Sequence, residues 1–196
     1  MTTPGWDEAY AAGRAPWDIG RPQRAFAALA ERGLLSGRVL DAGCGTGEHT
    51  LLAAAHGAAA TGVDVSPRAI AAAREKAAAR GLDARFEVGD ALDLPALGGT
   101  FGTAIDSGLF HVFDDAARDR YVASLAAVLE PGGTCHLMCF SDRQPGDFGP
   151  RRVSQDELRA AFAEGWVVDA ITADSFEVSA DLGGSAQAWL AALRRA

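Results

Sequence analysis

The chain has 196 residues, of which 48% are hydrophobic, and a formal net charge of −8 at pH 7. We expect a single domain over 1–196, since one domain usually takes about 100–200 residues. The acidic balance argues against a nucleic-acid binder, which would carry a basic surface, and no apolar run is long enough to span a membrane. The polar, acidic N-terminus and three cysteines without disulfide or metal spacing favour a cytoplasmic protein with no metal site.

Helices and short apolar strands alternate along the chain, which predicts an α/β fold with helices on both faces of a parallel sheet. In chain order, the first half of the sequence predicts a helix at 23–32, a strand at 39–41, a helix at 47–56, a strand at 61–64, a helix at 67–80, and strands at 84–88 and 101–106. Ser66 and Pro67 supply the N-cap and the first residue of the 67–80 helix, and Gly81 follows its end.

The second half of the chain continues the alternation. It predicts a helix at 121–129, a strand at 133–140 and a further helix opened by a capping box of Ser154 and Glu157. We expect an antiparallel pair of strands at 166–171 and 175–179 and a short last helix at 186–194.

The stretch RVLDAGCGTGEHT, residues 38–50, is the most informative part of the sequence. A short apolar strand ends at Asp41, and three glycines follow it at every second position, Gly43, Gly45 and Gly47. Backbone without a Cβ can approach a ligand closely. Asp64 lies 21 residues after Gly43 at the end of the next strand, where a carboxylate can accept hydrogen bonds from ribose hydroxyls. The layout predicts a nucleotide site at the carboxyl ends of parallel strands.

The spacing of the glycines indicates which nucleotide binds. A dinucleotide fold needs G-x-G-x-x-G and a helix N-terminus aimed at a pyrophosphate. Here Glu48 stands at the position of the last glycine, and its carboxylate would repel a pyrophosphate; it suits a ligand with an amino group and a cationic centre. A nicotinamide-dependent reductase is further disfavoured because Lys76 is the only lysine and no separate substrate domain is present.

At these residues the chain strongly resembles the class I S-adenosylmethionine-dependent methyltransferases, whose first motif, (D/E)-x-G-x-G-x-G, matches from Asp41 to Gly47. The resemblance implies a Rossmann-like doubly wound sheet of seven strands in the order 3-2-1-4-5-7-6, with strand 7 antiparallel, and S-adenosylmethionine as the cofactor. It implies that the glycines pass under the methionine part of the cofactor. Asp41 is expected to hold the loop or to meet the cofactor amino group through water.

The resemblance also assigns the nucleoside part of the cofactor. Asp64 is expected to bind both ribose hydroxyls, and Val65 to lie against the adenine. Asp90, in the stretch EVGDALDLP, matches the position whose carboxylate accepts from the adenine amino group. Beside it, Ala91 offers a backbone amide and Leu92 an apolar wall.

The strand at 101–106 ends in Asp106, Ser107 and Gly108. We expect Asp106 and Ser107 to contact cofactor or substrate, because ligands bind at this end of such sheets. His111 is the main candidate for a general base, since histidine titrates near neutral pH, and Tyr10 is an outside candidate. The alternative is that His111 bonds to backbone or packs beside the cofactor.

Residues 1–22 combine aromatic side chains with glycine, proline and charge, which predicts a lid that covers a ligand and excludes water. The stretch PWDxGR, Pro16 to Arg21, resembles that of the thiol and halide methyltransferases, relatives of the thiopurine methyltransferase group, and Trp6 and Tyr10 resemble that family's aromatic spacing. The resemblance implies that Trp17 helps to enclose the cofactor beside a small, apolar acceptor pocket. The alternative is an aromatic anchor that packs on the sheet edge.

The expected reaction is methyl transfer to a small-molecule acceptor by a monomer or homodimer. A thiol has a pKa near 8.5 and ionises with little help, so the lack of strong bases favours a thiol or sulfide. Residues 106–113 depart from the plant halide enzymes, which argues against a halide acceptor. The alternatives are an O-methyltransferase acting on a phenol with His111 as base, and a cofactor-binding protein without catalysis. The loop after the strand at 133–140 is the expected site of substrate selection.

Overall fold

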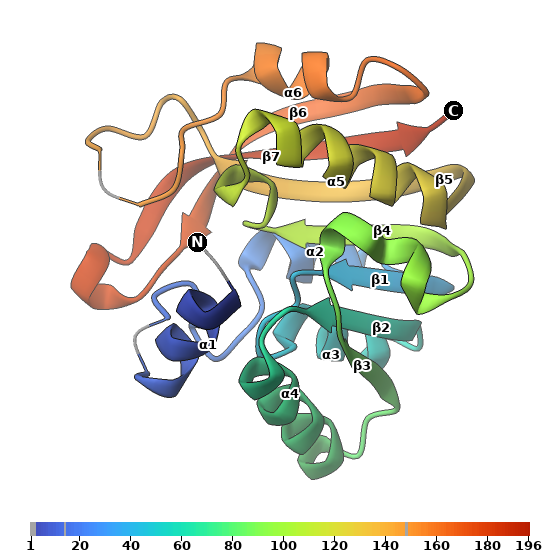
Figure 1. The fold of residues 1–196 in the computed structure, drawn as a ribbon, viewed down its shortest axis with the longest axis vertical. Coiled ribbons are helices and arrows are strands. Elements are labelled where there is room, and N and C mark those ends of the chain that lie inside the picture. The colour runs from blue at the N-terminus through green and yellow to red at the C-terminus, as the bar shows by residue number, and fades with distance from the viewer. Residues whose placement is uncertain (1–2, 14, 148) are drawn as a thin grey trace.

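A single seven-stranded sheet runs through the molecule in the order β3-β2-β1-β4-β5-β7-β6 (Figure 1). The computed structural model describes residues 3–13, 15–147 and 149–196. The first five strands are parallel, and β7 is antiparallel to both of its neighbours. The predicted strand order and the antiparallel strand 7 are therefore confirmed. The strands are β1 (Arg38–Ala42), β2 (Ala59–Asp64), β3 (Ala84–Val88), β4 (Phe101–Ser107), β5 (Leu129–Phe140), β6 (Trp166–Glu177) and β7 (Ser185–Arg195).

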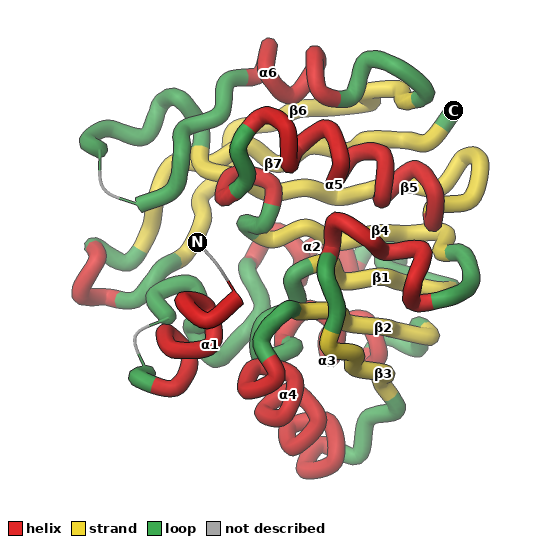
Figure 2. Tube along the Cα trace, viewed as in Figure 1, coloured by secondary structure: helices red, strands yellow, loops and turns green. Residues whose placement is uncertain are grey.

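Helices cover both faces of the sheet, as Figure 2 shows in red. Val39 and Leu40 are both fully buried, and because successive strand side chains point to opposite faces, each belongs to a different core cluster. Leu40 packs in the cluster under α5 and α6, and Val39 packs in the cluster under α2 and α3. The helices are α1 (Thr3–Ala11), α2 (Arg24–Glu31), α3 (Glu48–Ala55), α4 (Pro67–Arg80), α5 (Asp115–Val128) and α6 (Gln155–Ala161).

Local sequence signals place the helix ends where the sequence predicts them. The Ser66 hydroxyl accepts from the Ala69 amide at the start of α4, and Gly81 closes that helix in the left-handed conformation. Ser154 and Glu157 form the predicted capping box of α6. One helix is longer than predicted, since α5 begins at Asp115, where the Asp114 carboxylate accepts from the Ala117 amide.

The C-terminal prediction is wrong in two places. Residues 166–171 and 175–179 are not a pair, because one continuous strand, β6, runs from Trp166 to Glu177. The segment 186–194 is not a helix but β7, which pairs with β5 on one side and β6 on the other. Its alanines and leucines favour a helix by propensity, but pairing on both sides overrides that weak preference.

The sheet brings the functional segments to one edge. In β1 to β5 the chain runs in the same direction, so their carboxyl ends lie together. Ligands in open α/β sheets bind outside these ends. The glycine loop after β1, Asp64 at the end of β2 and Ser107 at the end of β4 therefore face the same space.

Candidate active site

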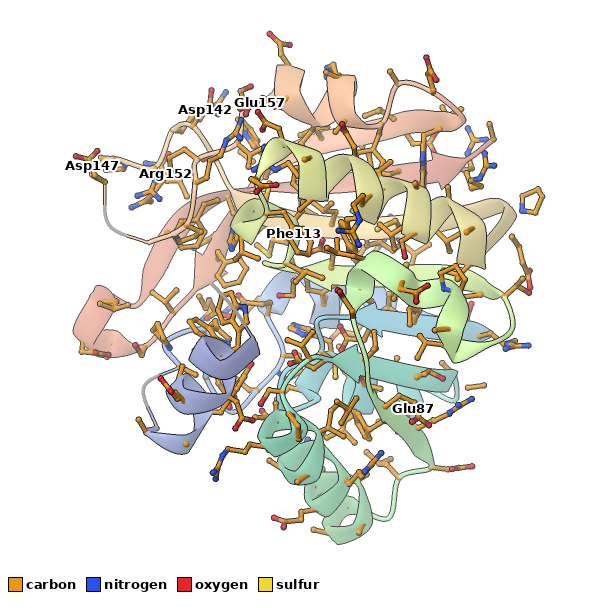
Figure 3. The ribbon with its side chains drawn as sticks, viewed as in Figure 1. Glu87, Phe113, Asp142, Asp147, Arg152 and Glu157 are labelled. Carbon is orange, nitrogen blue, oxygen red and sulfur yellow. The ribbon has the colours of Figure 1, made fainter. Side chains whose placement is uncertain are left out.

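A cavity of about 1190 Å³ opens at the carboxyl ends of the strands. It has two parts. We define the cofactor half by the tips of β1, β2 and β3, with Gly43, Gly45, Asp64, Val65, Asp90 and Leu92. We define the acceptor half by the tips of β4 to β7, with Ser107, His111, Phe113, Phe140, Arg152 and Phe176. Figure 3 labels Phe113 near the start of α5 and Arg152 on the loop after β5.

The glycine loop has a backbone conformation and close contacts that residues with a Cβ could adopt only with strain. Gly47 has a φ of 88°, and a Cβ there would lie 2.8 Å from the Phe86 ring and 2.9 Å from Ala73. Gly45 has a φ of 53°, and a Cβ there would lie 2.6 Å from the Tyr10 hydroxyl. Gly47 is therefore needed for packing under the loop, and Gly45 for the close approach of the N-terminal segment above it.

Asp64 lies at the centre of the cofactor half. Its carboxylate accepts from the amides of Gly45 and Ser66, both at 2.9 Å, and so ties the tip of β2 to the glycine loop. Burial raises the pKa of this carboxyl, and the two amide hydrogen bonds oppose that shift. The side chain is only half-buried and lines the cavity, so it can also meet a ligand.

Asp41 lies beneath the loop and does not line the cavity. Its carboxylate is 1% exposed and accepts from the Thr50 hydroxyl at 2.7 Å, which joins the end of β1 to α3. Burial raises the pKa of Asp41 to about 7. Of the two roles expected for Asp41, this geometry provides the one of holding the loop.

The position of Glu48 in the motif predicts a carboxylate that is free to meet a cationic ligand. In the structure this carboxylate is already paired. It accepts from Lys76 at 2.8 Å and forms a two-pronged ion pair with Arg80, both on α4. These hydrogen bonds hold the pKa of Glu48 below its usual value despite the opposing effect of burial. Glu48 therefore joins α3 to α4 rather than serving a ligand.

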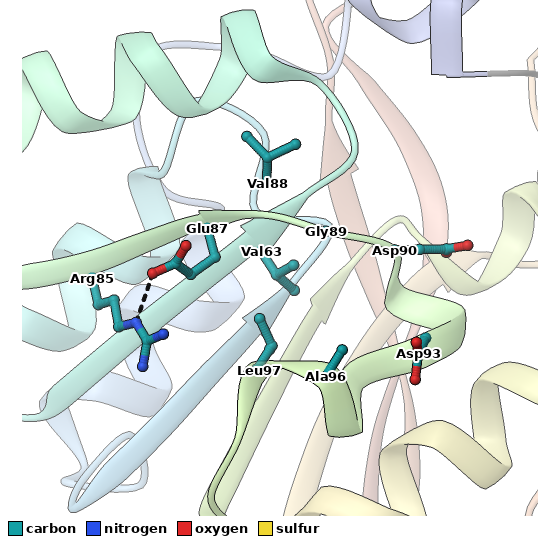
Figure 4. Close-up of a pocket in the computed structure, with 9 residues that line it drawn as sticks. All are labelled: Val63, Arg85, Glu87, Val88, Gly89, Asp90, Asp93, Ala96 and Leu97. Carbon is teal, nitrogen blue, oxygen red and sulfur yellow. Dashed lines mark hydrogen bonds and ion pairs between the residues drawn. The ribbon is translucent and has the colours of Figure 1, made fainter.

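Asp90 opens the short 3-10 helix Ala91–Leu97. Its carboxylate accepts from the Leu92 amide at 2.9 Å, and Asp90, Ala91 and Leu92 all line the cavity. Behind Asp90 lies a smaller pocket of about 190 Å³, which Figure 4 shows between Glu87 and Leu97. The cap orients Asp90 at the wall where the adenine group is expected.

Asp106 does not reach the cavity. It is fully buried, and its carboxylate accepts from the amides of Leu109 at 2.7 Å and Phe110 at 3.0 Å. Burial raises its pKa to about 7, and these amides oppose the shift. Asp106 thus shapes the turn after β4, while its neighbour Ser107 lines the cavity.

His111 lies on the short 3-10 helix Phe110–Val112 and lines the acceptor half. Its Nδ1 accepts from the Phe140 amide at 2.9 Å, and its ring stands edge-on to the Phe140 ring. Burial lowers the pKa of His111 to about 3, with further contributions from the charges of Arg118 and Arg152. The ring is therefore neutral at physiological pH.

Tyr10 and Trp17 lie over the glycine loop. The Trp17 indole nitrogen donates to the Tyr10 hydroxyl at 2.9 Å, and Trp6 stands edge-on to Trp17 with ring centroids 5.1 Å apart. Burial raises the pKa of Tyr10 well above its usual value, and the nearby charge of Asp64 adds to this effect. Tyr10 therefore remains a neutral phenol in this position.

The N-terminal segment predicted as a lid, residues 1–22, of which 1–2 and 14 lie outside the described residues, contacts the rest of the fold at two points. Asp7 accepts from the Ser66 hydroxyl at 2.7 Å and from Arg68 at the start of α4. Arg21 forms a two-pronged ion pair with Glu177 at the end of β6. These contacts place α1 beside the start of α4 (Figure 1), and Trp6 and Tyr10 of α1 line the cavity.

Comparison with known proteins agrees with this arrangement. A family model described as a methyltransferase domain matches residues 39–133. The chain is 40% identical over 164 residues to the 2-heptyl-1-hydroxyquinolin-4(1H)-one methyltransferase of Mycobacteroides abscessus, with 82% of this chain and 72% of the relative covered. The chain belongs to the class I S-adenosylmethionine-dependent methyltransferases. It is an enzyme that uses S-adenosylmethionine, so the reductase and the non-catalytic alternatives are set aside.

Two further proteins are similar to this methyltransferase. A structure solved in work on the conversion of a disulfide bond into a thioacetal group during echinomycin biosynthesis is 40% identical, with a TM-score of 0.88 over 99% of this chain and 93% of that chain. The probable thiol methyltransferase 2 of Arabidopsis thaliana is 28% identical over 78% of this chain and 69% of that protein. No helix in the described ranges is long and apolar enough to cross a membrane.

The donors and acceptors of the cofactor half fit S-adenosylmethionine. Half-buried Asp64 faces the cavity with a carboxylate for hydroxyl groups, and Gly43 and Gly45 of the glycine loop line the cavity beside it. Asp90 and the apolar side chains of Val65 and Leu92 flank the neighbouring wall. These residues would hold the ribose, the methionine part and the adenine.

Sequence reasoning missed much of the acceptor half. Phe140 and Phe176 lie at the ends of β5 and β6 and read as ordinary core residues, because apolar side chains in strands usually are. Leu182 comes from the short 3-10 helix between β6 and β7, and Ala186 from the start of β7, neither of which the sequence predicts. The loop after β5 does line the cavity, as its position predicts.

Proposed function

We propose that this methyltransferase acts on small, mostly apolar acceptors whose nucleophilic atom ionises without a strong base, with a thiol or sulfide as the first choice. The observation that carries the proposal is the state of the two expected bases. The pKa of His111 is lowered to about 3, and that of Tyr10 is raised by burial. Neither is poised to take a proton near pH 7, where a general base works best if its pKa is close to the pH.

The cofactor, when bound, supplies an activated methyl group on a sulfonium. The chain then has to align the acceptor and exclude water, and good alignment alone contributes several kcal/mol. The lid contributes to exclusion through Tyr10 and Trp17, which close over the glycine loop. We infer that Asp64, Asp90 and the glycine loop hold the cofactor, while the acceptor binds against His111, Phe140 and Phe176.

A thiol suits this site because it ionises close to neutral pH, with a reference pKa of about 8.5. The acceptor half is rich in apolar surface and is bordered by Arg152, which favours a small apolar molecule carrying an anionic atom. The thiol methyltransferase relative supports the same choice. Asp106, the other expected catalytic residue, acts in this proposal only by shaping the turn that carries His111.

A second candidate is O-methylation of an acidic hydroxyl on a flat aromatic molecule. Three phenylalanine rings line the acceptor half, at positions 113, 140 and 176, and such rings favour stacking on a planar acceptor. The relative from Mycobacteroides abscessus is named for a 1-hydroxyquinolinone. An N-hydroxyl or phenol of low pKa would need no more help than a thiol does.

The decisive experiment measures S-adenosylhomocysteine formed by the purified protein. Aliphatic thiols, sulfide, thiophenols, phenols of graded acidity and a 1-hydroxyquinolinone are supplied with S-adenosylmethionine between about pH 6 and pH 9. Turnover of thiols or sulfide supports the first choice, and turnover of acidic hydroxyls alone supports the second. Turnover only of alkyl alcohols or amines, which need a strong base, would show that the proposal is wrong.

A further inference from the structure

His111 is held with only one ring nitrogen available to a ligand. The residue is 5% exposed, between the end of β4 and the start of α5. Its ring centroid lies 5.1 Å from that of Phe140 and 6.0 Å from that of Phe176. The Phe140 and Phe176 rings are themselves 5.4 Å apart, so both pack against the same side of His111 and restrict the orientation of its ring.

The Phe140 amide determines which nitrogen carries the proton. That amide lies 2.9 Å from Nδ1 and donates to it. A backbone N–H can only donate, so Nδ1 must present its lone pair. A neutral imidazole has one proton, and here it is therefore on Nε2.

The Nε2–H faces the cavity. A Cβ on Gly108, a residue that also lines the cavity, would lie 3.3 Å from Nε2. In the described parts of the chain no oxygen accepts from Nε2. Nε2 is also not one of the fully buried side-chain atoms that lack a hydrogen-bond partner, so it is not sealed off from the cavity. Nε2 is thus an accessible donor, and a ligand in the cavity can accept from it.

The charges around His111 favour an anion. Arg118 approaches from α5, where its Nε donates to the Phe110 carbonyl at 3.3 Å and its guanidinium pairs with Glu157 at 3.6 Å. Arg152 approaches from the loop after β5, where it donates to the carbonyls of Gln144 and Gly146.

The remaining neighbours of the ring leave this positive bias in place. The nearest carboxylate on the preceding strand, Asp106, accepts from the amides of Leu109 and Phe110. The side chains of β5 and β6 that face the ring, Phe140 and Phe176, carry no charge.

We propose that His111 acts as a hydrogen-bond donor, whose Nε2–H holds the anionic sulfur or oxygen of the acceptor in front of the methyl group, and not as a base. This inference rests on the proposed function. The acceptor loses its proton to water before transfer. Its lone pair then forms the new bond to the methyl carbon while the carbon–sulfonium bond breaks, and that electron pair remains on the departing sulfur. His111 keeps the same charge throughout.

Two substitutions separate the donor at Nε2 from the hydrogen bond between Nδ1 and the Phe140 amide. In His111→Asn, the amide oxygen can still accept from the Phe140 amide, but the side chain ends short of the Nε2 position. In His111→Gln, the amide nitrogen reaches the Nε2 position and can donate. We expect His111→Asn to lower kcat by about 100- to 1000-fold, the size seen when one preorganised donor is removed, and His111→Gln to keep more of the activity. Affinity for S-adenosylhomocysteine should stay within about twofold, because the cofactor half is untouched.

The pH profile distinguishes a donor from a base. Above the pKa of the acceptor a base is not needed, whereas a donor still is. We therefore expect the kcat defect of His111→Asn to persist above the acceptor pKa, where the acceptor is already ionised. A defect that vanishes once the acceptor is ionised would overturn the inference and make His111 the base.

The ring nitrogens can be observed without any acceptor. In ¹⁵N-labelled full-length protein, with His111→Asn used to assign the signals, we expect Nε2 to be protonated, Nδ1 to be unprotonated and neither to titrate above about pH 5. A proton on Nδ1, or titration near neutral pH, would overturn the inference whichever acceptor is used. If the wild type methylates neither thiols nor acidic hydroxyls, the proposed function fails while this spectrum still decides the tautomer.

Discussion

The two halves of the cavity are built in different ways. The cofactor half uses three short stretches, each directly after a strand, and much of its polar surface is backbone or carboxylate: the glycine loop, Asp64 and Asp90. The acceptor half draws side chains from β4, β5, β6, the loop after β5 and the turn before β7. Local motifs are therefore enough to build the cofactor half for one ligand. The specificity of the acceptor half can instead be changed by substituting single side chains in segments that are far apart in the sequence.

The charged groups around the two halves also differ. Carboxylates border the cofactor half, at Asp18, Asp64 and Asp90, and suit a ligand with a cationic sulfonium. The acceptor side carries charges of both signs, Arg151 and Arg152 beside Asp114 and Asp147. An anionic acceptor would therefore be held there by single donors and not by an overall positive field.

The largest expected effect is on the cofactor half. We expect Asp64→Ala to weaken binding of S-adenosylhomocysteine by at least about 100-fold, because hydrogen bonds to a charged group contribute about 1.5–3 kcal/mol each. Titration calorimetry measures the change. The matched control is Asp93→Ala, which removes an exposed carboxylate on the nearby 3-10 helix outside the main cavity. Equal losses in both variants would mean that Asp64 has no special place in the site.

The second expected effect is on pH-dependent stability, since one buried carboxyl lies at the base of each half. The pKa of Asp106 rises from 3.8 to about 7 on folding. The folded state therefore holds a proton that the unfolded chain releases, so this contribution is fully present below about pH 4 and is lost as the pH rises to about 7. As the pH rises from about 4 to about 7, the free energy of unfolding of Asp106→Asn should therefore increase by a few kcal/mol relative to that of the wild type.

Urea unfolding at several pH values measures that difference. Asp41→Asn, at the base of the cofactor half, should behave in the same direction, since the pKa of Asp41 is also raised to about 7. Asp119→Asn, on the exposed side of α5, is the control. A difference between wild type and Asp106→Asn that does not change with pH would contradict the raised pKa.

A third effect should be confined to the acceptor half. Phe176 is buried between β6 and the cavity, against His111 and Phe140. We expect Phe176→Leu to raise the KM for the acceptor about 10-fold, which corresponds to a loss of roughly 1.4 kcal/mol of binding free energy. The affinity for the cofactor should not change. Phe162→Leu, an equally buried change away from the cavity, is the control. A matching change in cofactor affinity would show that the halves are not independent.

The smallest effect tests the lid. Tyr10→Phe removes the acceptor for the Trp17 indole N–H but keeps the ring over Gly45. The loss of one neutral hydrogen bond, about 0.5–1.5 kcal/mol, predicts a cofactor Kd raised about three- to tenfold. An unchanged Kd with a lowered kcat would instead assign Tyr10 to the chemical step.

Sequence reasoning succeeds best in the cofactor half and fails most at the C-terminus. The motif from Asp41 to Gly47 and the spaced Asp64 lie close together in the sequence and meet at the same end of the sheet, where the Gly45 amide donates to Asp64. The segment 186–194 has the composition of a helix, yet it forms strand β7, because pairing with β5 on one side and β6 on the other overrides its helical propensity. Asp106, expected to contact cofactor or substrate, turns away from the cavity and accepts from nearby amides. Asp41 accepts from the Thr50 hydroxyl beneath the glycine loop, which is the first of the two roles expected for it.

The sequence by itself determined the strand–loop transitions, the family and the cofactor, because these depend on residues close together in the chain and on backbone conformations that only glycine tolerates. Only the tertiary structure decided how Phe140, Phe176 and His111 meet, since their segments are joined through the sheet and not through local sequence. It also decided that His111 offers a proton rather than a lone pair to the cavity, because that depends on a single amide, Phe140, 29 residues away in the chain.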